Sequence, residues 1–169
     1  MPKINLSKLP AGLFHCPLSK VKELIPELVP IIQKAPIYPD EKYIVDAKIH
    51  MLMPNQWACI PNWHYDNIPR DKNNKQMMSK RDVNKKMFLY VSGEPLTEFI
   101  RAGGLPMSVP ASTWIEFDQW DLHRGTMSKI HTWRLFIRLT PEPLLKPAKP
   151  SDWLRKHSQV YLDTSNFTW

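Results

Sequence analysis

The stretch Trp57-Ala58-Cys59-Ile60-Pro61-Asn62-Trp63-His64-Tyr65-Asp66-Asn67 is the part of the chain around which the rest is organised. His64 and Asp66 lie two residues apart in it. Side chains of an extended backbone alternate between its two faces. If this stretch is a strand, one imidazole and one carboxylate therefore point to the same side and can approach the same ligand.

A second stretch, Asp121-Leu122-His123-Arg124-Gly125, supplies another candidate ligand. If a neighbouring strand brings His123 to the same point, two histidines and one carboxylate occupy one triangular face of a metal ion. The opposite coordination positions then stay free. This is the ligand set of non-haem Fe(II) oxygenases. The sequence therefore predicts a metal site made of His64, Asp66 and His123.

Length and composition favour one domain. The chain has 169 residues, with 43% hydrophobic and 23% charged residues, which is ordinary for a globular protein. It holds 17 prolines and only 5 glycines, a bias that favours many short segments over long helices. We expect a single domain over residues 1–169, with its core between about residues 43 and 140.

Neither a membrane segment nor a disulfide framework is expected. No apolar run approaches the roughly 20 residues that cross a bilayer, and the N-terminal residues lack the apolar core of a signal peptide. Cys16 and Cys59 lie far apart and match no zinc-ligand spacing. These features predict a cytoplasmic protein that does not enter membranes.

Hydrophobic periodicity predicts mainly β structure. Residues 19–34 have apolar residues at helical spacing, and Pro26 and Pro30 are expected to kink or split that helix. Apolar residues alternate from Tyr43 to Met53, which indicates a strand. Further short strands are predicted at residues 87–92, 97–101, 112–117 and 132–139. Residues 1–17 are expected to be irregular, and the Pro-rich residues 141–169 to form a linker and tail. Several short strands favour an all-β sandwich or barrel.

The stretch from Asn67 to Lys86 is strongly basic. It carries seven lysines and arginines against two aspartates, so it supplies +5 of the net charge of +7. One interpretation is a solvated loop. The other is a patch that attracts an anionic substrate, a nucleotide or a nucleic acid. Because a polar connection of about 20 residues is long for a compact domain, we expect an active-site lid or a disordered segment.

The predicted strand at residues 132–139 places two arginines on one face. Arg134, Phe136 and Arg138 share that face because they alternate with apolar residues. A guanidinium inside a barrel mouth is costly unless it meets a carboxylate, which its planar fork can hold through both oxygens. A dicarboxylate co-substrate would supply that partner.

Together these residues resemble the Fe(II)- and 2-oxoglutarate-dependent dioxygenases. The family pattern His-x-Asp, a distant His and then an Arg is matched by His64-Tyr65-Asp66, His123 and Arg134. Arg134 follows His123 by 11 residues and Arg138 follows it by 15. This spacing is most similar to the taurine dioxygenase and phytanoyl-CoA hydroxylase branches. The resemblance covers roughly residues 43–140.

The resemblance implies a double-stranded β-helix of the jelly-roll, cupin-like type with one or two flanking helices. It implies Fe(II) held by His64, Asp66 and His123, with 2-oxoglutarate and O2 as co-substrates for hydroxylation of an unidentified substrate. Arg134 would bind the distal carboxylate of 2-oxoglutarate. Arg138 would contact an anionic prime substrate or a structural acid. Tyr90 is a further candidate for contact with 2-oxoglutarate, although tyrosines at such positions are more often part of the core.

Two other functions stay open at this point. A cupin-type metal-binding barrel would use the same three ligands without 2-oxoglutarate. A non-catalytic barrel would bind nucleic acid through residues 67–86 and exposed tryptophans. Among the other histidines, His50 is expected to be a hydrogen-bonded surface residue, and aromatic residues near the site are expected to pack in the core.

Overall fold

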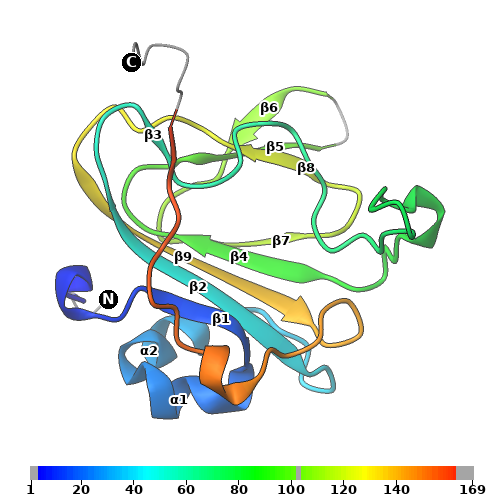
Figure 1. Ribbon diagram of the computed structural model, residues 1–169, viewed down its shortest axis with the longest axis horizontal. Helices are drawn as coiled ribbons and strands as arrows, with labels where there is room; N and C mark the ends of the chain where they lie inside the picture. The colour runs from blue at the N-terminus through cyan, green and yellow to red at the C-terminus, as the bar shows by residue number, and fades with distance from the viewer. Residues whose placement is uncertain (1–3, 102–103, 163–169) are drawn as a thin grey trace.

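Two antiparallel sheets form the body of the protein (Figure 1). The structure is a computed structural model that describes residues 4–101 and 104–162. The larger sheet has the strand order β1 (Gly12–Pro17), β2 (Tyr43–Leu52), β9 (Thr132–Pro141), β4 (Met87–Val91) and β7 (Trp114–Phe117). The smaller sheet has the order β6 (Pro106–Ser108), β5 (Thr97–Ile100) and β8 (Leu122–Gly125). β3 (Gln56–Trp57) and β10 (Tyr161–Leu162) form a separate pair. The fold of the described residues is therefore mainly β.

The pairing of β2 with β9 decides which side chains face the site. The two strands pair antiparallel over their full ten residues, with Asp46 opposite Arg138 and His50 opposite Arg134. Because strand side chains alternate, one face of this pair is apolar and packs in the main core. The other face carries the charged residues and looks toward the smaller sheet. This alternation confirms the faces predicted for residues 43–53 and 132–139.

Two short helices cover the apolar face of the larger sheet. They are α1 (Val21–Leu24) and α2 (Val29–Ile32), separated by a 3-10 turn over Pro26–Leu28 (Figure 1). Proline lacks an N–H donor and clashes with the preceding turn, so the helix breaks before Pro26. Pro30 lies within the first turn of α2, where proline is tolerated. Val21, Ile25 and Leu28 pack against the sheet. The predicted split helix outside one sheet is confirmed.

The N-terminal residues are more regular than expected. Residues 12–17 form β1, although Gly12 and Pro17 indicated breaks in the chain. Gly12 has φ +130°, and a Cβ there would lie 2.1 Å from the carbonyl oxygen of Ala47 on β2. Glycine is therefore required because the two backbones approach closely at this point. Short 3-10 turns precede and follow this strand, at Leu6–Lys8 and Leu18–Lys20.

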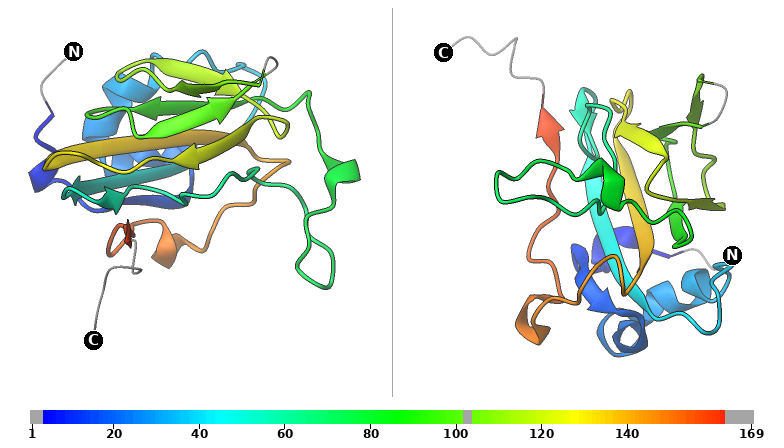
Figure 2. Two further views of the ribbon diagram at one scale, coloured as in Figure 1. Left: turned by 90° about the horizontal axis from the view of Figure 1, so that it is seen from above. Right: turned by 90° about the vertical axis from the view of Figure 1, so that its right-hand side faces the viewer.

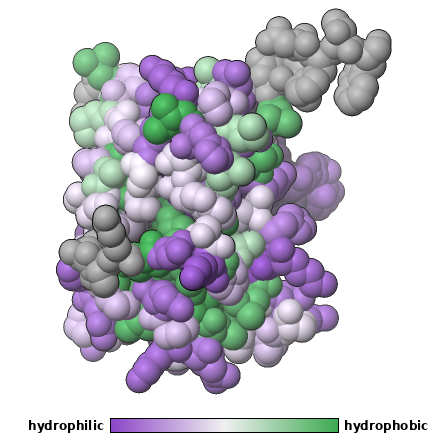
Figure 3. All heavy atoms as spheres, turned by 90° about the vertical axis from the view of Figure 1, so that its left-hand side faces the viewer, coloured by the Kyte–Doolittle hydropathy of each residue, from purple (hydrophilic) through white to green (hydrophobic). Residues whose placement is uncertain are grey.

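The C-terminal segment packs back on the body up to residue 162, so its described part is not a free linker. It contains a 3-10 turn at Pro150–Asp152 and pairs with Leu13 and then with β3. Trp153 packs against the main core. Trp169 and the rest of residues 163–169 lie outside the described residues. On the face shown in Figure 3, hydrophobic side chains lie between hydrophilic ones.

The basic loop over residues 67–86 extends away from the sheets (Figure 2). Its outer part is a turn in which Arg70 pairs with Gln76, and it continues into a 3-10 turn at Met78–Lys80. Asp71 accepts hydrogen bonds from the backbone N–H groups of Asn73 and Lys75. These hydrogen bonds lie within the loop itself. None of the helices in the described ranges is long and apolar enough to span a membrane.

Candidate metal centre

The three predicted metal ligands converge at one point between the sheets. His64 and His123 of β8 form an antiparallel bridge, in which each backbone N–H donates to the other's carbonyl at 2.9 and 3.0 Å. This bridge extends the smaller sheet by a short extended segment at His64 and brings Asp66 alongside. The potential ligand atoms of His64, Asp66 and His123 all lie within 4.8 Å of one another. The Nε2 of His123 lies 3.2 Å from Oδ2 of Asp66.

Both imidazoles are held in the orientation that a metal requires. Nδ1 of His64 lies 2.7 Å from the carbonyl oxygen of Asn62, and Nδ1 of His123 lies 3.2 Å from that of Asp121. Because a carbonyl oxygen only accepts, each Nδ1 carries the proton in the neutral ring. The lone pair of each neutral ring then lies on Nε2. Because Nε2 of His123 lies 3.2 Å from Oδ2 of Asp66, a shared proton or a metal ion is needed to make this approach favourable. Carbonyl partners of this kind fix the tautomer and orientation of metal-binding histidines in general.

Aromatic packing holds His123 in place. Its ring stacks on Phe99 at a centroid distance of 5.0 Å and meets Phe117 edge-on at 5.8 Å. Its ring also lies 4.4 Å from that of His64. Burial, followed by repulsion from His123, lowers the pKa of His64. A lowered pKa keeps that imidazole neutral at physiological pH, which metal coordination needs.

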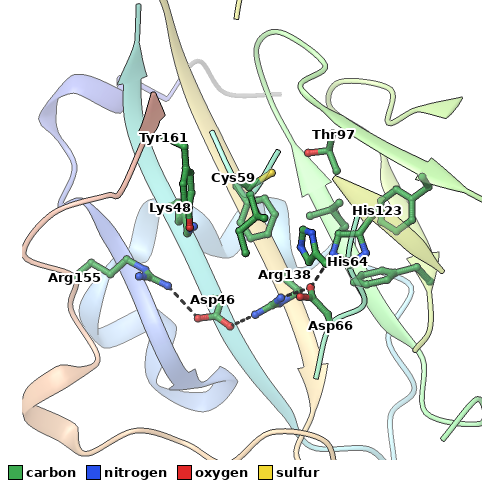
Figure 4. Close-up of a pocket in the computed structure, with 15 residues that line it drawn as sticks. Asp46, Lys48, Cys59, His64, Asp66, Thr97, His123, Arg138, Arg155 and Tyr161 are labelled. Carbon is green, nitrogen blue, oxygen red and sulfur yellow. Dashed lines mark hydrogen bonds and ion pairs between the residues drawn. The ribbon is translucent and has the colours of Figure 1, made fainter. Parts of the chain in front are cut away.

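Arg138 connects the candidate ligand Asp66 to a second acid. Its guanidinium donates to Oδ2 of Asp66 and, at 2.8 Å, to Oδ2 of Asp46 (Figure 4). Burial alone would raise the pKa of Asp66, but Arg138 and His123 hold it well below its usual range. The carboxylate is therefore charged and fixed in position. Of the two roles expected for Arg138, contact with a structural acid is the one that this geometry matches.

Arg134 lies in a different environment from the one expected. It is fully buried and donates to the hydroxyl of Thr97 at 2.8 Å. Its Nε and Nη1 have no hydrogen-bond partner within the described residues. Arg134 itself is not among the residues that line the central cavity, whereas Thr97 and Phe136 beside it are. Arg134 therefore does not contact the cavity directly.

His50 and Tyr90 differ from their expected environments. His50 is buried, with 5% exposure, and neither ring nitrogen has a partner in the described part of the chain. The prediction of a hydrogen-bonded surface histidine is wrong, because the polar face of β2 faces the interior. Tyr90 packs in the main core against Trp114, whereas its neighbour Leu89 lines the cavity. Because adjacent strand residues face opposite sides, this placement does not fit contact with 2-oxoglutarate.

A cavity of about 140 Å³ opens beside the three ligands (Figure 4). Figure 4 shows His64, Asp66 and His123 on one side of it and Lys48, Arg155 and Tyr161 on the other. An engineered apolar cavity of about 150 Å³ holds one benzene-sized molecule, so this space suits one small ligand. The charged residues that line it are Asp46, Lys48, Asp66, Arg138 and Arg155.

An open groove of about 720 Å³ adjoins the cavity at the His64–Asp66 segment. It shares Ile60, His64 and Asp66 with the cavity, and its further lining comes from residues 65–78. Arg70 and Lys75 of the basic loop are part of that lining. The groove thus gives a larger molecule access to the same two ligands.

Several residues of the cavity were not found from the sequence. Asp46 and Lys48 alternate with apolar residues of β2, which was the available signal that they share an inner polar face. Arg155 and Tyr161 had no such signal, since they come from the segment interpreted as a linker. Arg155 donates to Asp46 at 3.2 Å and to the carbonyl of Ala47 at 3.0 Å.

Comparisons with known proteins leave the family unassigned. No protein-family model matches the chain, and no curated protein matches it. A crystal structure of protein NMB1881 from Neisseria meningitidis is similar at a TM-score of 0.30 and 14% identity. The match covers 67% of this chain and 96% of that chain. A likeness this low assigns neither a fold nor a function.

Proposed function

We propose that the protein is an Fe(II)- and 2-oxoglutarate-dependent oxygenase that hydroxylates a substrate bound beside His64, Asp66 and His123. The observation that carries this proposal is the convergence of the three ligand atoms within 4.8 Å, next to a cavity for one small molecule. His64 and Asp66 lie two positions apart in the sequence, and His123 comes from β8.

The donor set fits iron better than a structural zinc ion. Two imidazoles and one carboxylate form one face, and structural zinc sites are closed by four protein ligands, often thiolates. The Nδ1 atoms of both histidines face carbonyl oxygens, which leaves both Nε2 atoms as the ligand atoms. Cys59 lines the same cavity, but burial raises the pKa of its thiol, which disfavours the thiolate that binds metals.

The order of the strands supports the finer fold that goes with this function. From β2 onward the chain passes back and forth between the two sheets, except that β5 and β6 follow each other in the smaller sheet, and β9 returns between β2 and β4. We count β2 as the first strand and the His64 segment as the second, so that β9 is the last. In this count the larger sheet has the strand order first (β2), last (β9), third (β4) and sixth (β7). We propose that this arrangement is a jelly roll, with β1 added at one edge.

The chain's own residues would orient the ligands and the substrate. With iron bound, the chemistry converts O2 and 2-oxoglutarate into succinate and CO2, and one oxygen atom enters a C–H bond of the substrate. Arg138 fixes the charged Asp66, and Phe99 and Phe117 fix the ring of His123. The aromatic and aliphatic lining restricts water near the reacting groups.

The prime substrate would enter through the open groove on the loop side. Its lining includes Arg70 and Lys75, and their side chains form no ion pair with a carboxylate in the structure described here. The two acids of the loop, Asp71 and Asp82, accept hydrogen bonds from backbone N–H groups. Arg70 and Lys75 are the cations of the groove lining, and its one carboxylate, Asp66, is paired with Arg138, so the lining favours an anionic substrate such as a nucleotide or a nucleic acid.

Anaerobic titration with Fe(II) and 2-oxoglutarate tests the proposal. Chelation of the iron by the 2-oxo acid should give a weak visible charge-transfer band, and admission of air should yield succinate. His123→Gln removes one ligand and is expected to abolish both signals. A wild-type protein that binds Fe(II) but neither chelates nor consumes 2-oxoglutarate would instead favour the second candidate.

That second candidate is a cupin-type metal-binding barrel that does not use 2-oxoglutarate. It is favoured by one observation, which is that neither arginine of β9 is available in the cavity. Arg138 is engaged by two carboxylates, and Arg134 donates to Thr97 and does not line the cavity. Another cation must therefore hold the distal carboxylate if 2-oxoglutarate is the co-substrate.

A further inference from the structure

The cavity has more positive than negative charge in its lining. It contains three cationic side chains, Lys48, Arg138 and Arg155, and two carboxylates, Asp46 and Asp66. Arg138 binds both carboxylates, and Arg155 binds Asp46. Lys48 forms no hydrogen bond or ion pair with any residue in the described ranges 4–101 and 104–162. One lysine of the cavity lining therefore has no ion-pair partner among the described residues.

A partly buried ammonium group without an ion-pair partner is unfavourable. Burial, followed by repulsion from Arg155, lowers the pKa of Lys48. The acid nearest along its own strand face is Asp46, and its oxygens already interact with Arg138, Arg155 and the backbone N–H of His15. A buried charge is stabilised chiefly by a partner of opposite sign. An anion from outside the chain would be that partner for Lys48.

We propose that Lys48 binds the distal carboxylate of a small dicarboxylate whose other end lies at the metal centre. This inference rests on the proposed function, and it assigns the carboxylate site to β2 and the C-terminal segment instead of to the arginines of β9. Lys48 is two residues from Asp46 on the same face, which places it about 7 Å along the strand. Figure 4 shows it across the cavity from His123. A short dicarboxylate suits the cavity volume of about 140 Å³.

The C-terminal segment completes the wall of this carboxylate site. Arg155 is fixed there by Asp46 and by the carbonyl oxygens of Leu13 and Ala47, at 2.8 and 3.0 Å. Tyr161 is placed by the pairing of β10 with β3. Both side chains line the cavity beside Lys48 (Figure 4). The segment that reads as a linker therefore contributes to ligand selection.

The test compares two 2-oxo acids that differ only at the distal end. Both 2-oxoglutarate and 2-oxobutyrate can chelate Fe(II), but 2-oxobutyrate lacks the second carboxylate. We expect the wild-type protein to prefer 2-oxoglutarate by about tenfold or more in anaerobic titrations, as loss of a partly buried charged contact implies. Lys48→Gln should lose this preference and keep its affinity for 2-oxobutyrate. Lys156→Gln, which changes an exposed lysine beside Arg155, is the matched control.

The outcomes separate this inference from the proposed function. If Lys48→Gln keeps the wild-type preference for 2-oxoglutarate over 2-oxobutyrate, Lys48 is not the carboxylate site. Loss of that preference in Arg134→Gln would assign the site to Arg134. If the wild-type protein does not bind 2-oxoglutarate, the proposed function fails, and succinate then tests the anion site alone. A rise in melting temperature with succinate in the wild type and in Lys156→Gln, but not in Lys48→Gln, supports the site. An equal rise in all three proteins, or none, overturns it.

Discussion

The two ends of one strand pair each carry an arginine on the same face, but the two arginines have different partners. At one end, Arg138 of β9 lies opposite Asp46 of β2 and binds both Asp46 and Asp66. At the other end, Arg134 lies opposite His50, and no carboxylate binds either of them in the described structure. Both arginines are on the same face, four residues apart. The difference shows that the partner across the sheet, and not the residue type, decides whether an arginine supports the site.

The largest effect is expected for the metal ligands themselves. His123→Gln should lower activity by more than about 100-fold, because loss of a residue that merely supports a ligand typically costs 10- to 100-fold. Fe(II) affinity, measured by anaerobic titration, should fall with it. Far-ultraviolet circular dichroism should change little, since the side chain lies at the cavity. Undiminished Fe(II) affinity would mean that the third ligand is a different residue.

Loss of Arg138 should destabilise the paired end of the strands. Arg138→Met leaves Asp66 without its cation and weakens the surroundings of Asp46, and breaking a buried ion pair from one side costs about 3–5 kcal/mol. Urea unfolding should show this loss, and Fe(II) affinity should also fall because Asp66 is no longer oriented. Unchanged stability combined with weaker binding of an anionic substrate would instead give Arg138 the substrate role.

Substitution of Arg134, which has no carboxylate partner, should raise the stability of the protein instead of lowering it. Arg134→Met removes a buried charge that has no carboxylate partner, at the cost of one hydrogen bond to Thr97. We expect a gain in stability of about 1 kcal/mol, because the desolvation cost exceeds the value of one hydrogen bond. The concentration of 2-oxoglutarate needed for half-maximal turnover should stay unchanged. A strong increase in that concentration would restore the role that the family resemblance implies.

The smallest effect is expected from acid titration of His50. Burial, followed by repulsion from Arg134 and Lys48, lowers the pKa of His50 to about 3. Below pH 6.5 the unfolded state binds a proton that the folded state does not, so the contribution of neutral His50 to stability falls as pH decreases toward 3. Between pH 7 and pH 6 the wild type should lose roughly 0.7 kcal/mol relative to His50→Leu.

His50→Leu must be compared with the wild type at each pH, because the pKa values of His15 and His64 are lowered too. The melting temperatures of the two proteins should diverge as pH falls. Parallel curves would show that His50 is charged, or paired, in the folded protein. That result would also remove the contrast between the two ends of the strand pair.

Much of the site could be predicted because its signals are local. His64 and Asp66 are two residues apart, so any extended backbone turns them to one side. The alternation over residues 43–53 and 132–139 predicted two strands and their inner and outer faces. The break before Pro26 follows from the covalent structure of proline. Each of these features depends on residues within a few positions of each other.

β1 and β6 had weaker signals and were missed. β1 begins at a glycine that pattern reasoning treats as a break, yet the glycine is needed because Ala47 approaches its backbone. All three residues of β6 are exposed, so no alternation of apolar residues marks this strand. Strand formation at both places depends on a neighbouring strand that is distant in sequence. The hydrogen bonds of that neighbour stabilise the extended backbone whatever the local preference.

The sequence by itself determined the three candidate ligands, the inner face of β9 and the basic character of the loop. Tertiary structure alone decided that Arg138 and not Arg134 meets Asp66, and that Lys48, Arg155 and Tyr161 line the same cavity. The physical reason is that charge pairing depends on strand register and on which segments pack together. Register is set by hydrogen bonds and packing summed over whole strands. The local sequence around a charged residue therefore does not identify its ion-pair partner.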